Sequence, residues 1–93
     1  MKITEGYRLI PSIEKQVRRF IIENFLFGQG ADQLRNDDSF LDKGIIDSTG
    51  VLELVSFLEE RYRIKIEDEE LIPDHLDSVD KLVEFIERKL KRG

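Results

Sequence analysis

The chain has 93 residues, enough for one compact domain and too few for two. Hydrophobic residues make up 40% and charged residues 38%, a balance that favours a solvated helical bundle over a disordered chain or a sheet-rich fold. The absence of cysteine excludes disulfides, thiolate metal sites and cysteine nucleophiles.

The net charge of −5 is unevenly distributed along the chain. Residues 37–77 contain thirteen acidic and four basic residues, whereas the rest of the chain has seven acidic and eleven basic residues. An acidic middle repels phosphate backbones, so we expect no nucleic-acid partner. The same charge would steer basic protein surfaces toward the chain, although many small acidic domains carry such charge only for solubility.

No membrane partner is expected either. No apolar stretch approaches the ~20 residues that span a bilayer, and the first residues lack the apolar run of a secretory signal. We therefore expect a cytoplasmic protein. No linker or repeat divides the sequence, so the chain is interpreted as a single domain over residues 1–93 with a core of about 10–90, and as a monomer.

The first helix is predicted from about Pro11 to Leu26. Pro11 suits a first helical turn, where its missing N–H costs nothing, and the helix should stop near Gly28. Its apolar stripe recurs at three- and four-residue steps and consists of Ile13, Val17, Phe20 and Ile21.

A long polar loop over 28–46 should follow, a length that is uncommon in compact domains unless the loop is functional. We expect it to be pinned to the core by Phe40, Leu41, Ile45 and Ile46.

A second helix should begin at Asp47 and Ser48 and run to Arg61 or Tyr62. Its buried stripe is predicted to be Val51, Leu54, Val55, Leu58 and Tyr62. Residues 63–66 alternate as a short extended connection, and 67–72 should form one short helical segment that Pro73 ends.

The last helix should be capped by Asp77 or Ser78 and run to about Leu90. Its predicted stripe is Val79, Leu82, Val83 and Ile86. The fold class expected is therefore all-α: a four-helix bundle of three longer helices and one short third helix, with a long loop between helices 1 and 2.

Enzyme and metal sites find little support in the sequence. His75 is the only histidine, no Gly-x-Ser-x-Gly elbow is present, and we interpret His75 as a solvated loop residue. An EF-hand loop begun at Asp37 would place Leu41 at the fifth position and Ser48 where a bidentate Glu is needed. Phosphate-binding glycine motifs are also missing. We expect no catalytic residue, no metal ligand and no enzyme activity.

The pair Asp47 and Ser48 has an ordinary interpretation, because both residue types are favoured helix N-caps. Its surroundings add to this. Leu52, Glu53 and Leu54 follow Ser48 at the fourth, fifth and sixth positions, and further along the chain come Leu58, Glu59, Glu60 and Tyr62. With the Phe-x-x-x-Gly approach at 40–44, this stretch resembles the modification site of acyl carrier proteins, and the similarity covers most of residues 10–90.

The resemblance implies a specific role for these residues. A phosphopantetheinyl transferase would attach 4′-phosphopantetheine from coenzyme A to the Ser48 hydroxyl, with Asp47 helping the transferase engage. An acyl or aminoacyl group would then be carried as a thioester and delivered from an activating ligase to downstream transferases. The exposed face of the second helix would contact these enzymes, through Thr49, Leu52, Glu53, Ser56, Glu59 and Glu60.

The chain departs from fatty-acid-synthesis carriers at three positions. Thr49 and Ser56 stand where that group usually has larger apolar residues, and Gly44 lies four residues before Ser48 where those carriers more often place glycine three before. This spacing of Gly44 and Ser48 resembles that in D-alanyl and other stand-alone aminoacyl-type carriers. We therefore expect a specialised carrier, loaded with an amino acid or an unusual acyl group.

Two other classes stay open from the sequence. One is a non-covalent interaction module, in which an acidic second helix binds a basic partner and Ser48 serves only as a cap. The other is a divalent-metal sensor, which the missing EF-hand ligands weaken. Modification of Ser48 distinguishes the carrier from both.

Overall fold

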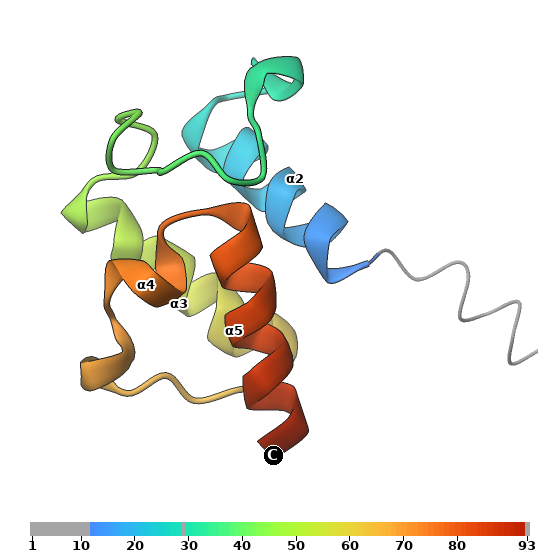
Figure 1. The fold of residues 1–93 in the computed structure, drawn as a ribbon, viewed down its shortest axis with the longest axis vertical. Coiled ribbons are helices and arrows are strands. Elements are labelled where there is room, and N and C mark those ends of the chain that lie inside the picture. The colour runs from blue at the N-terminus through green and yellow to red at the C-terminus, as the bar shows by residue number, and fades with distance from the viewer. Residues whose placement is uncertain (1–11, 29, 93) are drawn as a thin grey trace, which may run out of the picture.

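The computed structural model describes residues 12–28 and 30–92. Its elements in chain order are α2 (Ile13–Phe25), the 3-10 turn η1 (Ala31–Gln33), α3 (Ser48–Tyr62), the 3-10 turn η2 (Asp68–Glu70), α4 (Pro73–Leu76) and α5 (Val79–Arg92) (Figure 1). No strand occurs within these residues. The predicted all-α bundle is confirmed, with α2, α3 and α5 as the longer helices and α4 as the short third one.

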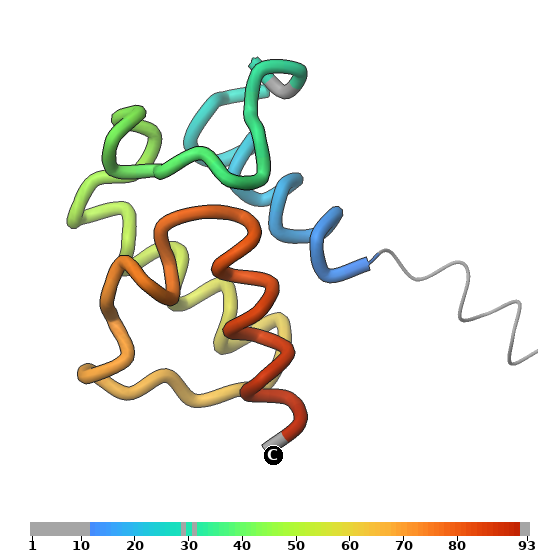
Figure 2. Tube along the Cα trace, in the orientation of Figure 1, coloured from blue at the N-terminus to red at the C-terminus, as the bar shows by residue number. Residues whose placement is uncertain are grey.

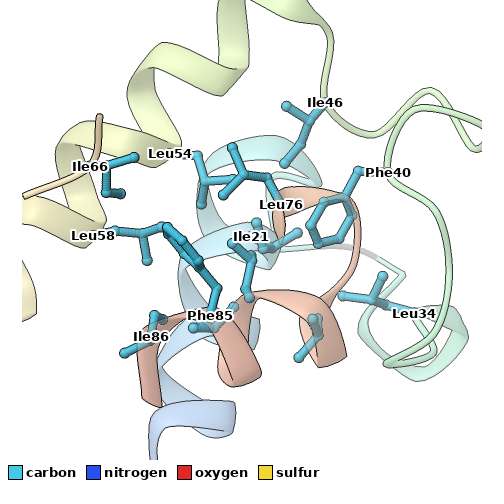
Figure 3. Packing of buried hydrophobic residues seen from close by; sticks show 13 residues of the cluster. Ile21, Leu34, Phe40, Ile46, Leu54, Leu58, Ile66, Leu76, Phe85 and Ile86 are labelled. Atoms are coloured by element: carbon cyan, nitrogen blue, oxygen red, sulfur yellow. The ribbon is translucent and has the colours of Figure 1, made fainter. Parts of the chain in front are cut away.

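Helix α5 is the centre of the bundle, because it contacts each of the other three helices. Its buried side is formed by Val79, Leu82, Phe85 and Ile86, so Phe85 extends the predicted stripe. Figure 3 shows side chains from the other elements converging on this face. The remaining buried apolar residues are Val17, Ile21, Leu34, Phe40, Ile46, Leu54, Leu58, Ile66 and Leu76.

Helix α2 begins after Ser12, whose hydroxyl accepts a hydrogen bond from the Lys15 N–H at 3.2 Å. The predicted role of Pro11 in the first turn lies outside the described residues. The helix ends at Phe25, and the chain then turns through Phe27 and Gly28, which both have positive φ. The Gly28 N–H closes the helix end by donating to a carbonyl of the last turn.

The long loop is anchored by Leu34, Phe40 and Ile46, which are buried, while Ile45 is half-buried. Leu41 was predicted to join them, and this was wrong: 51% of its surface is exposed. In the turn after Phe40 the two neighbouring side chains cannot both face the core, and Phe40 takes the buried side. Figure 2 shows the loop passing over the turn between α4 and α5.

The short segment before α5 differs from the prediction. Residues 67–72 do not form one helical segment that Pro73 ends; η2 stops at Glu70, and Pro73 instead begins α4. Ile72 is extended, as expected for a residue that precedes proline. Proline has no N–H to donate, so a first helical turn accommodates it without loss, and a helix can start there as readily as it can end.

Helix α5 is capped by Ser78 and not by Asp77. The Ser78 hydroxyl is buried and accepts a hydrogen bond from the Lys81 N–H at 3.1 Å. Asp77, one residue earlier, is thereby free to bind the long loop. The helix runs two residues beyond the predicted end at Leu90.

Candidate functional site

The start of α3 is organised by Asp47. Its carboxylate accepts a hydrogen bond from the Gly50 N–H at 2.8 Å, and its carbonyl accepts the Val51 N–H at 3.1 Å. Asp47 is therefore the N-cap, and Ser48 is the first residue of the helix. An N-cap carboxylate satisfies one of the backbone donors that a helix start leaves unpaired.

Ser48 is exposed at this helix start. Its hydroxyl makes no hydrogen bond within the part of the chain that the structure describes. Because Asp47 caps the helix, the Ser48 side chain is not needed for that task. The geometry leaves a primary hydroxyl in solvent, beside the positive end of a helix dipole.

A cavity of about 190 Å³ opens beside Ser48. It lies between the start of α3, the segment around α4 and the long loop. Figure 3 shows Phe40, Ile46, Leu54 and Leu76 turned toward one another in this region. Apart from Ser48 and Asp77, its lining is apolar: Phe40, Leu41, Ile46, Val51, Leu54, Leu71, Ile72, Pro73 and Leu76.

Asp77 holds the loop side of this cavity in place. One carboxylate oxygen accepts the Leu41 N–H at 2.9 Å and the other accepts the Ser39 hydroxyl. The Asp77 carbonyl also accepts the Phe40 N–H at 2.9 Å. Three hydrogen bonds to one residue thus attach the loop to the turn between α4 and α5. Both oxygens of this carboxylate are engaged, so the cavity presents little free charge.

Five of the six side chains predicted to contact partners lie exposed on α3: Thr49, Leu52, Glu53, Ser56 and Glu60. Glu59 does not join them. It is half-buried, and its carboxylate accepts the Ile66 N–H at 2.9 Å. That hydrogen bond ties the connection after α3 back onto the helix, which gives Glu59 a structural role.

A polar cluster joins the η2–α4 segment to α5. The Glu70 carboxylate accepts hydrogen bonds from the Lys89 ammonium at 2.8 Å and from the Glu67 N–H at 2.9 Å. Both bonds lower the pKa of the Glu70 carboxyl, and the bond from Lys89 has the larger effect.

His75 was interpreted as a solvated loop residue, and this was wrong. It lies half-buried in α4, stacked on Phe85 with ring centres 4.8 Å apart, because the helix that begins at Pro73 turns it toward α5.

The described residues contain no group of three His, Asp or Glu side chains that could hold a metal ion. Of the helices formed by residues 12–28 and 30–92, none combines the length and the apolar character needed to cross a bilayer.

Two residues matter more at this site than the sequence indicated. Gly50, the third residue of α3, was assigned no role from the sequence, yet its backbone lies against the ring edge of Phe25. Asp77 was considered only as a helix cap. A glycine inside an amphipathic helix signals a close approach, but nothing in the sequence names the partner.

Comparison with known proteins places these features in a family, although no family model matches the chain. The chain is 35% identical over 80 residues to the acyl carrier proteins of Buchnera aphidicola subsp. Acyrthosiphon pisum, strains Tuc7 and APS. These alignments cover 86% of the chain and 95% of each relative. The acyl carrier protein of Buchnera aphidicola subsp. Schizaphis graminum (strain Sg) is 30% identical over 81 residues, covering 87% of the chain and 98% of the relative. The chain belongs to the acyl carrier protein family.

Proposed function

We propose that this acyl carrier protein holds its cargo as a thioester on a 4′-phosphopantetheine arm attached to Ser48, and that it acts as a carrier and not as a catalyst. The observation that supports this is the exposed Ser48 hydroxyl, which has no hydrogen-bonding task and stands at the rim of an apolar cavity. The phosphopantetheine arm would supply a terminal thiol, to which the cargo is joined as a thioester.

The residues around Ser48 suit a phosphodiester. In the transfer, the Ser48 oxygen bonds to the phosphorus of phosphopantetheine, the phosphoanhydride of coenzyme A breaks, adenosine 3′,5′-bisphosphate leaves, and the hydroxyl proton is released. The first N–H groups of α3 and its dipole favour an anion at this position. Asp47, as the N-cap, keeps that end of the helix formed while a transferase engages it.

The cavity favours an acyl chain as the sheltered cargo. An apolar cavity of about 150 Å³ is large enough for a benzene ring, so 190 Å³ has room for roughly six to eight carbon atoms. An ammonium group would lose its hydration in such a lining without a free carboxylate to pair with. An aminoacyl group would therefore stay on the arm outside the cavity.

The proposed partners are a phosphopantetheinyl transferase, an acyl- or aminoacyl-activating ligase and downstream transferases. The exposed carboxylates of Glu53 and Glu60 suit basic enzyme surfaces, which raises the rate of encounter more than the affinity. Polar Thr49 and Ser56 reduce the apolar contact area beside the arm. This smaller apolar area supports a role in a specialised pathway and not in general fatty-acid synthesis.

The decisive experiment is mass spectrometry after incubation with coenzyme A and a broad-specificity phosphopantetheinyl transferase. The expected result is a mass increase of about 340 Da, the mass of one phosphopantetheine group, that is absent from Ser48→Ala. Ser12→Ala is the matched control, because it removes another exposed helix-start hydroxyl and should be modified normally. Failure of the wild-type chain to gain mass would favour the non-covalent interaction module.

A further inference from the structure

The outer side of α3, away from the cargo cavity, forms an open groove with α2. Helix α2 contributes Phe20 and Asn24, and α3 contributes Leu52, Glu53, Ser56, Phe57 and Glu60. Four of the side chains that were expected from the sequence to contact partner enzymes therefore border this groove: Leu52, Glu53, Ser56 and Glu60. The α2 side of this depression was not expected from the sequence.

The floor of the groove is aromatic. Phe20 and Phe57 stack with ring centres 4.0 Å apart and planes inclined by 12°, and Phe25 packs edge-on against Phe20 at 5.8 Å. Leu52 borders this floor and is 62% exposed, the only large apolar side chain of α3 with such exposure. Stacked rings and a free leucine form a site for an apolar side chain from another protein.

The charge around the groove is negative. Glu53 and Glu60 are its only ionisable lining residues, and Asn24 and Ser56 are neutral. The basic side chains Arg19 and Arg61 line a neighbouring depression beyond the aromatic pair. A fitting partner surface therefore carries an apolar side chain flanked by Lys or Arg.

The groove is also close to the proposed modification site. Leu52 follows Ser48 by four residues, which is about one helical turn, or roughly 6 Å along the axis on the same face. A partner that fills the groove is thereby positioned to reach the Ser48 oxygen. With Thr49 and Ser56 polar, Leu52 and the aromatic pair offer the main apolar contact on this side of α3.

We infer that the phosphopantetheinyl transferase inserts an apolar side chain, flanked by basic residues, into the groove between α2 and α3. This inference rests on the proposed function, since it names the docking surface through which Ser48 is reached. It assigns Asn24, Phe20 and Phe57 to the partner footprint in addition to the acidic residues of α3.

Steady-state modification kinetics with the apo chain as variable substrate test the inference. Asn24→Arg fills the groove and adds a positive charge, and Leu52→Ala removes the exposed wall. Each should raise KM about tenfold, which corresponds to ~1.4 kcal/mol of lost binding, and change kcat less than about twofold. Gln33→Arg makes the same change of charge on exposed η1 and should leave both constants unchanged.

A titration of ¹⁵N-labelled Ser48→Ala chain with the same transferase locates the contact without turnover. The Asn24 side-chain amide and the Phe57 backbone amide should shift, with smaller shifts at Leu71 and Ile72 on the cavity side. Shifts confined to the cavity side, or unchanged KM in both groove variants, would overturn the docking surface while leaving modification of Ser48 intact. A wild-type chain that binds the transferase nowhere and gains no mass would remove both proposals.

Discussion

At the start of α3, helix capping and the proposed chemistry fall to two adjacent side chains. The Asp47 carboxylate caps the helix by accepting the Gly50 N–H, and Ser48 keeps its hydroxyl in solvent. Either residue type is able to cap a helix. The chain direction into the helix decides between them, because Asp47 is extended and Ser48 already has helical geometry.

This division predicts unequal stability effects. Asp47→Ala should lower the free energy of unfolding by about 1 kcal/mol, because the Gly50 N–H loses its acceptor. Ser48→Ala should change it by less than about 0.5 kcal/mol, as for an exposed side chain without partners. Urea unfolding of the two variants measures both values. A larger loss in Ser48→Ala than in Asp47→Ala would contradict the assignment of the cap.

A second residue-scale constraint acts at Gly50. A Cβ atom there would lie 2.8 Å from the Phe25 ring and 3.1 Å from an Ile46 methyl, closer than packed atoms tolerate. Exposed helical Gly→Ala changes usually stabilise by roughly 1 kcal/mol. Here overpacking of about 1–3 kcal/mol opposes that gain, so we expect Gly50→Ala to be destabilising.

The partner in this contact can be tested directly. Adding Phe25→Leu should make Gly50→Ala less costly than it is in the wild-type background, since the smaller side chain leaves room for the methyl group. A double-mutant cycle from urea unfolding gives the coupling energy. Additive effects would mean that the ring does not constrain this position.

At the scale of elements, a small polar cluster attaches the η2–α4 segment to α5. Glu70 pairs with Lys89, and the His75 Nδ1–H donates to the Glu70 carbonyl at 3.0 Å while the ring stacks on Phe85. Both side chains of the ion pair are largely shielded from solvent. The segment between η2 and α4 supplies Leu71, Ile72 and Pro73 to the cavity wall, so this cluster sets how firmly the wall is attached.

Acid should weaken this attachment. The pKa of Glu70 is below its ordinary value of 4.5, chiefly through the Lys89 hydrogen bond, so its stabilising contribution is present above that value and lost as pH falls through the lower folded pKa. On acidification from neutral pH, the free energy of unfolding should therefore fall more in the wild type than in Glu70→Gln. Urea unfolding across this range provides the comparison. Lys89→Met should reproduce the smaller pH dependence, and equal slopes in all three chains would contradict the role of the pair.

At the scale of the whole molecule, the cavity is enclosed by α3, the η2–α4 segment and the long loop, and α5 packs beneath these elements without lining the cavity. Helix α5 supplies the central packing face, and the loop is attached to the α4–α5 turn through Asp77. The Asp80 N–H adds a hydrogen bond to the Asn36 carbonyl at 2.9 Å. This arrangement leaves the side formed by Leu71 and Ile72, which lies outside regular helix, as the one best able to move.

Cargo length should therefore determine local opening. A hexanoyl chain fits the room for roughly six to eight carbons, whereas a hexadecanoyl chain requires α3 and α4 to separate. We expect faster amide exchange at Leu71 and Leu76 with hexadecanoyl than with hexanoyl cargo, measured by hydrogen–deuterium exchange on loaded protein. Exchange at Leu82 in α5 should be the same in both. Identical exchange at all three residues would show that the longer chain is not sheltered.

Much of this architecture was predictable from the sequence. The period of apolar residues located α2, α3 and α5, and the pair Asp47 and Ser48 marked the start of α3 to the residue. The resemblance around Ser48 also indicated the family. Helix periodicity is a local property that the chain expresses wherever one face is buried, so it is readable without knowledge of the neighbours.

Other features depended on contacts between distant residues. Pro73 suits a helix start as well as a helix end, and only packing of α4 on α5 decides that it begins one and that His75 stacks on Phe85. The close approach of Phe25 to Gly50 likewise joins residues far apart in sequence. The sequence by itself determined the three longer helices, most of their apolar faces and the candidate Ser48. The tertiary structure decided which of two capping residues is left free, where the cavity lies and that α2 borders a groove, because each depends on which side chains meet once the helices have packed.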